Sequence, residues 1–291
     1  MFHIPVLNGF KELAPHYQIL ICDIWGVLHN GRSAFDGVVE CLSTFKALGG
    51  TVLLLSNAPR PSAPIREQLA SLGVPKSAYD TIVTSGDLTR DLLEKKSTSS
   101  SFPLHHVGPE RDMTLFEGLN VACVPIADAK AIVCTGPFDD TTEGPDEYRA
   151  YWAPALARRL PFYCANPDLQ VQRGDQLIYC AGALAQDYER QGGDVTHLGK
   201  PHLPVYEFVS NHLQGLLRST PPKEKWLAIG DGLMTDILGA TRFGIDALLI
   251  TGGIHEPLLS NEKGEPDSDK IAGQLSTGKL RAKAAMRRLV W

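Results

Sequence analysis

Short apolar runs that end at a polar residue alternate with stretches of helical periodicity in the first part of the chain. Residues 18–22 form a predicted strand that ends at Asp23, and residues 51–55 form a second that ends at Ser56. Between them, apolar residues recur at helical spacing over 37–48. A strand, a helix and a strand in succession predict parallel pairing with a right-handed crossover.

The same alternation continues along the chain and returns near its end. It predicts further helices over 65–72, 88–94, 205–217 and 235–243, and further strands over 81–84, 226–229 and 247–250. The fold class expected from this pattern is α/β, with a Rossmann-like doubly wound parallel sheet as its core. The residues after the last of these strands, 251–255, are interpreted as a simple strand-exit loop, with the edge of a functional site as the alternative. Residues 279–288 have helical spacing and predict an amphipathic surface helix.

The middle of the chain alternates strand and helix on its own. Strands over 131–134 and 162–164 flank a predicted helix over 147–160, and this stretch is long enough for a small core. We therefore expect an inserted, smaller α/β cap domain. The expected division is 1–87 for the first part of the core, 88–181 for the inserted domain and 182–291 for the second part of the core.

Composition narrows the class of protein without identifying it. The chain has 291 residues, 43% of them apolar, which is ample for a packed core. A formal charge of −5 with interspersed signs gives no broad basic surface, so neither nucleic acid nor a membrane surface is an expected partner. The six cysteines contain no C-x-x-C pair and are interpreted as reduced core residues. No targeting or membrane-spanning segment is evident, so the expected location is cytoplasmic.

Chemically useful side chains follow several of the predicted strands. Asp23, Ser56 and Asp231 each stand at a strand's carboxyl end, where ligands gather in an open parallel sheet. A carboxylate there can attack phosphorus, a hydroxyl can hold phosphoryl oxygens, and further carboxylates can hold magnesium. Singly, these residues are typical of caps and turns, and Lys200 of a solvated surface. Their order and strand placement together favour a phosphoryl-transfer site.

The sequence resembles the haloacid dehalogenase-like hydrolases, specifically the class IIA subgroup of nitrophenylphosphatase-like, phosphoglycolate, pyridoxal-phosphate and nucleotide phosphatases. The resemblance covers nearly the whole chain. The segments that carry it are Asp23-Ile24-Trp25-Gly26-Val27-Leu28, Leu55-Ser56-Asn57, Gly199-Lys200-Pro201, Gly230-Asp231 with Thr235-Asp236, and Asn166-Pro167-Asp168 followed by Gly182-Ala183-Leu184.

The resemblance implies roles for particular residues. Asp23 would be the nucleophile that forms an aspartyl-phosphate, with Lys200 as a second catalytic residue. Phosphate binding would fall to Ser56, Asn57 and Lys200. The cofactor would be Mg²⁺, and its implied ligands are the Asp23 carboxylate, the Trp25 backbone carbonyl, Asp231 and, through water or hydrogen bonds, Asp236.

Trp25 departs from the phosphatases of this family, which carry aspartate at this position as general acid and base. Tryptophan can supply the carbonyl but cannot carry the proton. General acid–base catalysis typically contributes about 10²- to 10⁴-fold, so substrates whose leaving groups need no proton, such as nitrophenyl or acyl phosphates, should suffer least. His29 and Asp36 lie just downstream and are candidate substitutes.

Three functions therefore stay open at this point. The favoured one is a magnesium-dependent phosphatase of a small phosphorylated metabolite such as a sugar phosphate. A catalytically weak binding or regulatory protein would keep the phosphate site and lack the proton donor. A carbon–halogen hydrolase would also carry an aromatic residue at position 25, yet it would not need the acidic pair Asp231 and Asp236. The resemblance further suggests a homodimer.

Overall fold

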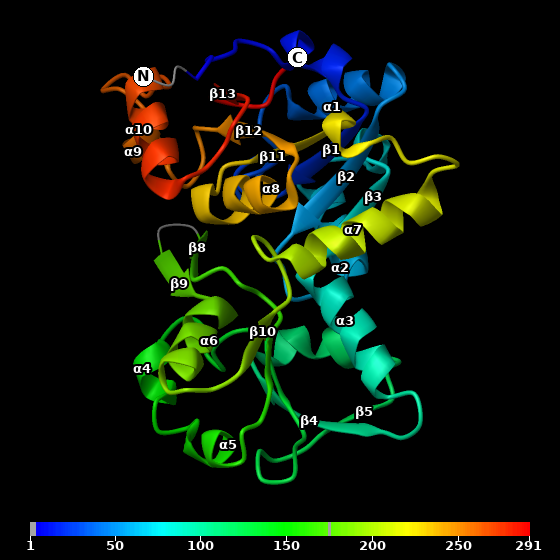
Figure 1. Ribbon diagram of the computed structural model, residues 1–291, viewed down its shortest axis with the longest axis vertical. Helices are drawn as coiled ribbons and strands as arrows, with labels where there is room; N and C mark the ends of the chain where they lie inside the picture. The colour runs from blue at the N-terminus through cyan, green and yellow to red at the C-terminus, as the bar shows by residue number, and fades with distance from the viewer. Residues whose placement is uncertain (1–3, 174–175) are drawn as a thin grey trace. The chain divides into compact units, whose positions relative to one another are not determined.

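The structure is a computed structural model that describes residues 4–173 and 176–291 (Figure 1). The chain divides into two compact units, each with its own sheet. The first comprises Met1–Ser56, Ile65–Val83 and Tyr206–Trp291, and the second comprises Asn57–Pro64 and Thr84–Val205. Both units combine parallel strands with helices, which confirms the predicted α/β class.

The first unit contains a six-stranded sheet with β11 and β1 at its centre (Figure 1). Pairing is parallel from β13 through β12, β11 and β1 to β2. The central strand is buried along its whole length, as its uninterrupted apolar sequence predicts. In spatial order the strands are β13 (Ala284–Met286), β12 (Asp246–Ile250), β11 (Trp226–Gly230), β1 (Ile19–Asp23), β2 (Thr51–Ser56) and β3 (Thr81–Thr84).

Helices connect these strands, as parallel pairing requires. The first crossover helix buries Val38, Cys41, Leu42 and Phe45, whose spacing places them on one face. The α-helices lying wholly or mostly in this unit are α1 (Val38–Ala47), α2 (Ser62–Ser71), α7 (Leu203–Leu216), α8 (Leu238–Phe243), α9 (Glu256–Leu259) and α10 (Ser268–Gly278). Shorter turns are η1 (Phe10–Glu12), η2 (Ala14–His16), η3 (Lys76–Ala78), η5 (Lys223–Lys225) and the π-helical turn η6 (Leu233–Ile237).

The second unit has a parallel sheet of five strands and a two-stranded antiparallel hairpin. Its core is aromatic: the Trp152 ring packs edge-on against Phe162 and Tyr188, and all three are fully buried. The sheet order is β10 (Val195–His197), β7 (Phe162–Cys164), β6 (Ile132–Cys134), β4 (Phe102–Val107) and β5 (Val121–Cys123), and the hairpin is β8 (Gln170–Arg173) with β9 (Gln176–Tyr179). Its helices are α3 (Ser85–Lys96), η4 (Glu110–Phe116), α4 (Pro145–Tyr148), α5 (Ala153–Ala157) and α6 (Ala181–Arg190).

The second unit extends beyond the inserted domain expected from the sequence. Strand β10 pairs with β7, so residues up to at least His197 share a sheet with residues that precede them. The contact division accordingly ends this unit at Val205. The assignment of residues 88–181 to a cap domain stays a prediction.

The single helix expected over 147–160 is wrong. Two short helices, α4 and α5, occupy this stretch, with Pro154 in the first turn of α5. Proline has no N–H to donate, and its ring would clash with the carbonyl of Ala150 in a continuous helix. The apolar periodicity was real, since Tyr148, Trp152 and Ala155 are buried, but proline divides the segment.

The helix expected over 279–288 is also wrong. Within it, Ala284–Met286 form the edge strand β13, which pairs in parallel with β12. Val6 also bridges to Ala285. All three residues of β13 are buried, so pairing with the sheet outweighs the helix propensity of alanine and methionine.

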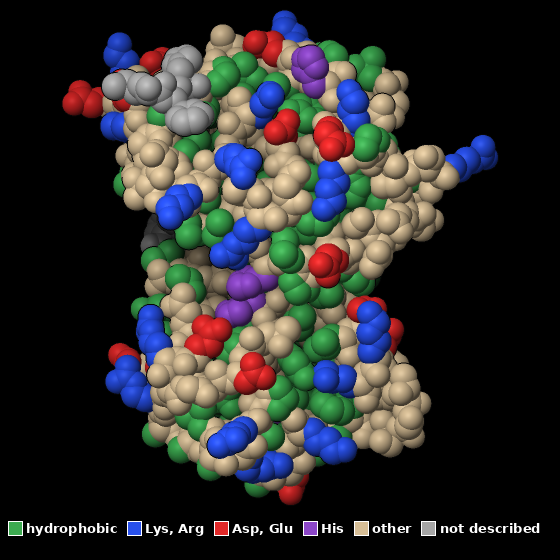
Figure 2. All heavy atoms as spheres, in the orientation of Figure 1, with side chains coloured by type: hydrophobic (Ala, Val, Ile, Leu, Met, Phe, Trp, Pro, Cys, Tyr) green, Lys and Arg blue, Asp and Glu red, His purple; other side chains and the backbone are tan. Residues whose placement is uncertain are grey.

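Surface features agree with a dispersed charge distribution. On the face drawn in Figure 2, basic and acidic side chains are interspersed. All six cysteines are free thiols, and of these only Cys123 is exposed. Among the described residues, no helix combines the length and apolar character needed to cross a bilayer.

Candidate active site

The nucleophile expected from the sequence stands at the carboxyl end of the central strand. Asp23 is the last residue of β1, is buried, and lies in register with Leu55 of β2. Ser56 follows Leu55, is half-buried and ends β2, so both residues reach the same edge of the sheet. A tight turn leads away from Asp23, in which the Leu28 N–H donates to the Ile24 carbonyl at 2.9 Å.

Asp231 and Asp236 follow the neighbouring strand β11. Asp231 comes directly after Gly230, and its Oδ2 accepts the Ile254 N–H at 2.8 Å. Asp236 lies in the π-helical turn η6, where its Oδ2 accepts the Gly232 N–H at 3.0 Å. π-Helical turns are frequent at functional sites, because the extra residue redirects side chains from a regular helix.

These three aspartates form one cluster. Asp23, Asp231 and Asp236 are all buried, and each offers a carboxylate oxygen within 4.8 Å of the others. Two like charges about 4 Å apart repel by roughly 4 kcal/mol at an effective dielectric constant near 20. A bound cation would offset this repulsion, and carboxylate oxygens are the ligands that Mg²⁺ prefers.

Two glycines allow the backbone to approach Asp231 closely. Gly26 has φ of 81°, in the left-handed region, and a Cβ there would overlap the Asp231 carboxylate. A Cβ at Gly253 would overlap the same carboxylate. Close backbone packing on two sides therefore fixes the Asp231 side chain. The carboxylate oxygens of the cluster are suitable ligands for a hard divalent cation.

Trp25 is held in place although its side chain is 39% exposed. Its indole contacts the His29 ring edge-on, with centroids 5.2 Å apart, and the backbones of the two residues form a bridge. A side chain at Gly31, where φ is 85°, would overlap the indole. The tryptophan is therefore an ordered apolar group two residues from the candidate nucleophile.

His29 does not provide the missing acid in this structure. Its Nδ1 accepts the Gly31 N–H at 3.0 Å, which requires an unprotonated nitrogen. Burial lowers the pKa of His29 to about 4. The imidazole is consequently neutral at pH 7. Asp36, the other substitute considered from the sequence, is exposed.

The neutral, buried state of His29 predicts an acid-sensitive stability. Its folded pKa of about 4 lies below the unfolded value near 6.5, so its contribution is complete above pH 6.5 and is lost as the pH falls toward 4. The loss should reach about 3 kcal/mol. Urea unfolding of His29→Asn, whose amide oxygen can still accept the Gly31 N–H, should show a flatter pH dependence than the native chain. The exposed His16→Asn should leave the native pH profile unchanged; an equally steep profile for His29→Asn would contradict the assignment.

The second unit holds the other predicted residues, Asn57 and Lys200, both 4% exposed. The Lys200 N–H donates to Asn57 Oδ1 at 2.7 Å, and Asn57 Nδ2 donates to the Lys200 carbonyl at 3.1 Å. Asn57 Nδ2 also donates to Asp168 Oδ1 at 2.9 Å. Asn57 thus fixes the backbone that presents Lys200. The structure brings the predicted residues together as two sets, one in each unit.

Two contributors to these sets were not assigned to the site from the sequence. The loop over 251–255 was interpreted as a simple strand exit in preference to an edge of the site, yet its Ile254 N–H donates to Asp231. Asp168 was noted only as part of a motif, yet it accepts a hydrogen bond from Asn57. The Gly252-Gly253 pair was the available signal for the first, because paired glycines after a strand indicate close backbone approach.

The fold and the carboxylate cluster define a Rossmann-like α/β protein with a candidate cation-binding active site. Family models agree: a haloacid dehalogenase-like hydrolase model matches residues 20–122, and a second model of hydrolases of this type matches 197–277. A solved haloacid dehalogenase-like hydrolase from Brucella suis is 39% identical, covers 98% of this chain and 100% of its own, and superposes with a TM-score of 0.84. The chain belongs to the haloacid dehalogenase-like hydrolases, as the sequence motifs predict.

More distant relatives carry named activities. The ribonucleotide monophosphatase NagD of Escherichia coli is 27% identical over 240 residues, which is 81% of this chain and 88% of that protein. A 4-nitrophenylphosphatase structure from Thermotoga maritima is 19% identical, covers 95% of this chain and 96% of its own, and has a TM-score of 0.72. The latter likeness is one of fold.

Proposed function

We propose that the protein is a magnesium-dependent phosphatase of small phosphorylated metabolites that acts through an aspartyl-phosphate on Asp23. The observation that carries the proposal is the cluster of Asp23, Asp231 and Asp236, buried at the carboxyl ends of β1 and β11. The named activity of NagD, a ribonucleotide monophosphatase, supports a phosphate ester as substrate. A sugar phosphate is one candidate within this class.

The proposed reaction has two steps. In the first, an Asp23 carboxylate oxygen bonds to phosphorus while the bond to the leaving oxygen breaks. In the second, water attacks phosphorus and releases Asp23 and inorganic phosphate. Ser56 and Lys200 are proposed to bind the phosphoryl oxygens, with Lys200 offsetting their charge. Asn57 is proposed to assist phosphate binding by positioning Lys200, because both hydrogens of its amide are already donated to Asp168 and the Lys200 carbonyl.

Magnesium would be held by the carboxylates of Asp23 and Asp231 and the carbonyl of Trp25, with Asp236 supporting it. When bound, it would neutralise charge on the transferring phosphoryl group. The N–H groups of Ile254 and Gly232 already orient Asp231 and Asp236, so the ligands are preorganised.

Trp25 favours substrates with weakly basic leaving groups. An alkoxide must be protonated as it departs, whereas a nitrophenolate or a carboxylate leaves without a proton. Neither Trp25 nor the neutral His29 can donate that proton at pH 7. Within the proposed substrate class, acyl and aryl phosphates should therefore be turned over faster than alkyl esters such as sugar phosphates.

The binding-protein alternative also rests on Trp25, because this residue removes a proton carrier and leaves the other predicted site residues in place. This alternative predicts that phosphorylated ligands bind but that none is turned over.

A carbon–halogen hydrolase is disfavoured, since three clustered carboxylates would oppose the approach of a halide. We propose a cytoplasmic location and, on the sequence resemblance, a homodimer.

Removing one carboxylate of the cluster should weaken magnesium binding. Asp231→Asn should lower Mg²⁺ affinity at least about tenfold, because a neutral amide replaces a charged ligand. Isothermal titration with Mg²⁺ measures this affinity directly. Phosphate release by the native protein should stop when excess chelator removes the metal. Asp36→Asn makes the same chemical change at an exposed carboxylate and should leave the affinity unchanged. Equal affinities for both variants would remove Asp231 from the metal site.

A further inference from the structure

The first unit contains a cavity at the opposite ends of the strands from the aspartate cluster. It has a volume of about 590 Å³, within the range of roughly 300 to 1,000 Å³ for small-molecule sites. Asp246, which begins β12, and Lys283, which precedes β13, both line it. The cavity therefore lies at the amino ends of these parallel strands, whereas Asp23 and Asp231 stand at the carboxyl ends of theirs.

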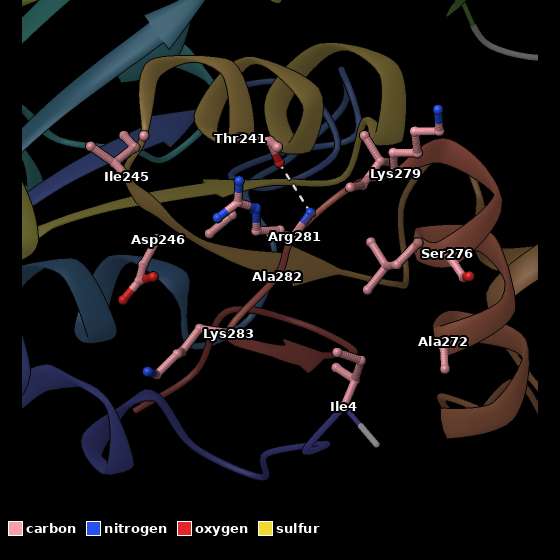
Figure 3. A pocket seen from close by; sticks show the side chains of 14 residues that line it. Ile4, Thr241, Ile245, Asp246, Ala272, Ser276, Lys279, Arg281, Ala282 and Lys283 are labelled. Carbon is pink, nitrogen blue, oxygen red and sulfur yellow. Dashed lines mark hydrogen bonds between the residues drawn. The ribbon is translucent and has the colours of Figure 1, made fainter. Parts of the chain in front are cut away.

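Its lining combines apolar and cationic side chains (Figure 3). Among the fourteen lining residues, Ile245, Ala247, Leu275 and Leu280 are buried apolar side chains. Exposed Lys279, Arg281 and Lys283 alternate along one short segment. Such a surface suits a ligand with an apolar body and a negative group.

The three cations are available to a ligand. Their side chains form no ion pair or hydrogen bond with any residue in the described parts of the chain. The single lining carboxylate, Asp246, already accepts a hydrogen bond from the Tyr17 hydroxyl at 2.7 Å. In a chain of net charge −5, this cavity is thus locally positive.

The segment that carries the cations is anchored by its backbone. The Arg281 N–H donates to Thr241 Oγ1 at 3.0 Å (Figure 3), and the Lys283 N–H donates to the Ala247 carbonyl at 2.7 Å. Lys279 directly follows α10 with φ of 52°, a left-handed conformation in which glycine is usual. Fixed backbone and unpaired side chains together present the charges at the cavity without using them for folding.

We propose that this cavity binds a small organic anion with an apolar body, at a site separate from the aspartate cluster. The buried apolar side chains of the lining contact the apolar body, and Arg281 and Lys283 bind the anionic group. Phosphate, carboxylate and sulfonate groups share this chemistry.

Naphthalenesulfonate is a suitable probe, because it has an apolar body, a negative charge and no phosphoryl group to hydrolyse. Isothermal titration should give one site per chain, with affinity at least about tenfold above that of neutral naphthylmethanol. The pair Arg281→Gln with Lys283→Gln should weaken probe binding about tenfold or more. The pair Lys76→Gln with Lys263→Gln removes the same charge from exposed sites outside the cavity and should leave binding unchanged.

Three results would overturn the proposal. The probe could fail to bind up to its solubility limit, or the cavity pair could bind it as tightly as the control pair. The third is loss of binding in Lys200→Gln and not in the cavity pair, which would place the anion at the proposed phosphate site. Thermal unfolding of every variant verifies that folding is retained, and a crystal soaked with the probe locates it independently.

Discussion

Asp23→Asn should abolish turnover, with kcat falling at least about 10⁴-fold. The amide keeps the size of the carboxylate but lacks the charge that attacks phosphorus. Asp23 ends the buried central strand of the first sheet, so a residue of the same shape should preserve the fold. Phosphate release from nitrophenyl phosphate in the presence of Mg²⁺ measures the effect.

Asp36→Asn provides the matched control for this result. It carries the same substitution on an exposed residue beyond the turn that follows β1, and it should retain native activity. If Asp36→Asn were instead the inactive variant, the exposed carboxylate would have to enter the mechanism. Full activity in Asp23→Asn, with the fold verified by circular dichroism, would exclude Asp23 as nucleophile.

Trp25→Asp should broaden the substrate range toward alkyl phosphates. A carboxyl group at this position can protonate a departing alkoxide. General acid catalysis of this kind typically raises the rate about 10²- to 10⁴-fold. We expect kcat/KM for glycerol phosphate to rise at least about 10²-fold, whereas that for nitrophenyl phosphate should change far less. The ratio of the two constants is the measurement, because it cancels differences in the amount of active enzyme.

Trp25→Phe separates the loss of the indole from the gain of a proton donor. It keeps an aromatic ring against His29 and should leave the ratio near its native value. A similar rise in Trp25→Phe would show that bulk, and not proton transfer, limits alkyl phosphates. No rise in folded Trp25→Asp would contradict the role given to position 25.

Five of the six strands of the first sheet were predictable because they are apolar runs that are largely buried. An apolar run such as 51–55 has no amphipathic alternative, and the polar residue after it marks the strand end. Helices in the inserted region were harder to predict. Buried Trp152 and Ala155 continue the helical periodicity, but Pro154 divides the segment into two helices. At the other end of the chain, Ala284–Met286 forms a strand because it pairs with β12, which its own sequence does not indicate.

The part of the candidate site built from aspartate side chains was predictable, because the residue type itself indicates the chemistry. Asp23, Asp231 and Asp236 follow strand ends, and the structure brings them into one cluster. Backbone donors carry no such side-chain signal: any residue could supply the Ile254 N–H that binds Asp231, and only the two glycines before it indicate the close approach. The link from Asn57 to Asp168 joins residues 111 positions apart, which spacing along the chain does not reveal.

The most direct test of the account is to find the phosphoryl group on the enzyme. Native protein is incubated with Mg²⁺ and nitrophenyl phosphate, quenched in acid and mapped by peptide mass spectrometry. The account predicts a hydroxylamine-sensitive phosphoryl group on Asp23. It also predicts that this phosphoryl-enzyme accumulates, because Trp25 cannot act as a base for the water that hydrolyses it. Turnover without any labelled aspartate, or a phosphoryl group on another residue, would contradict the account.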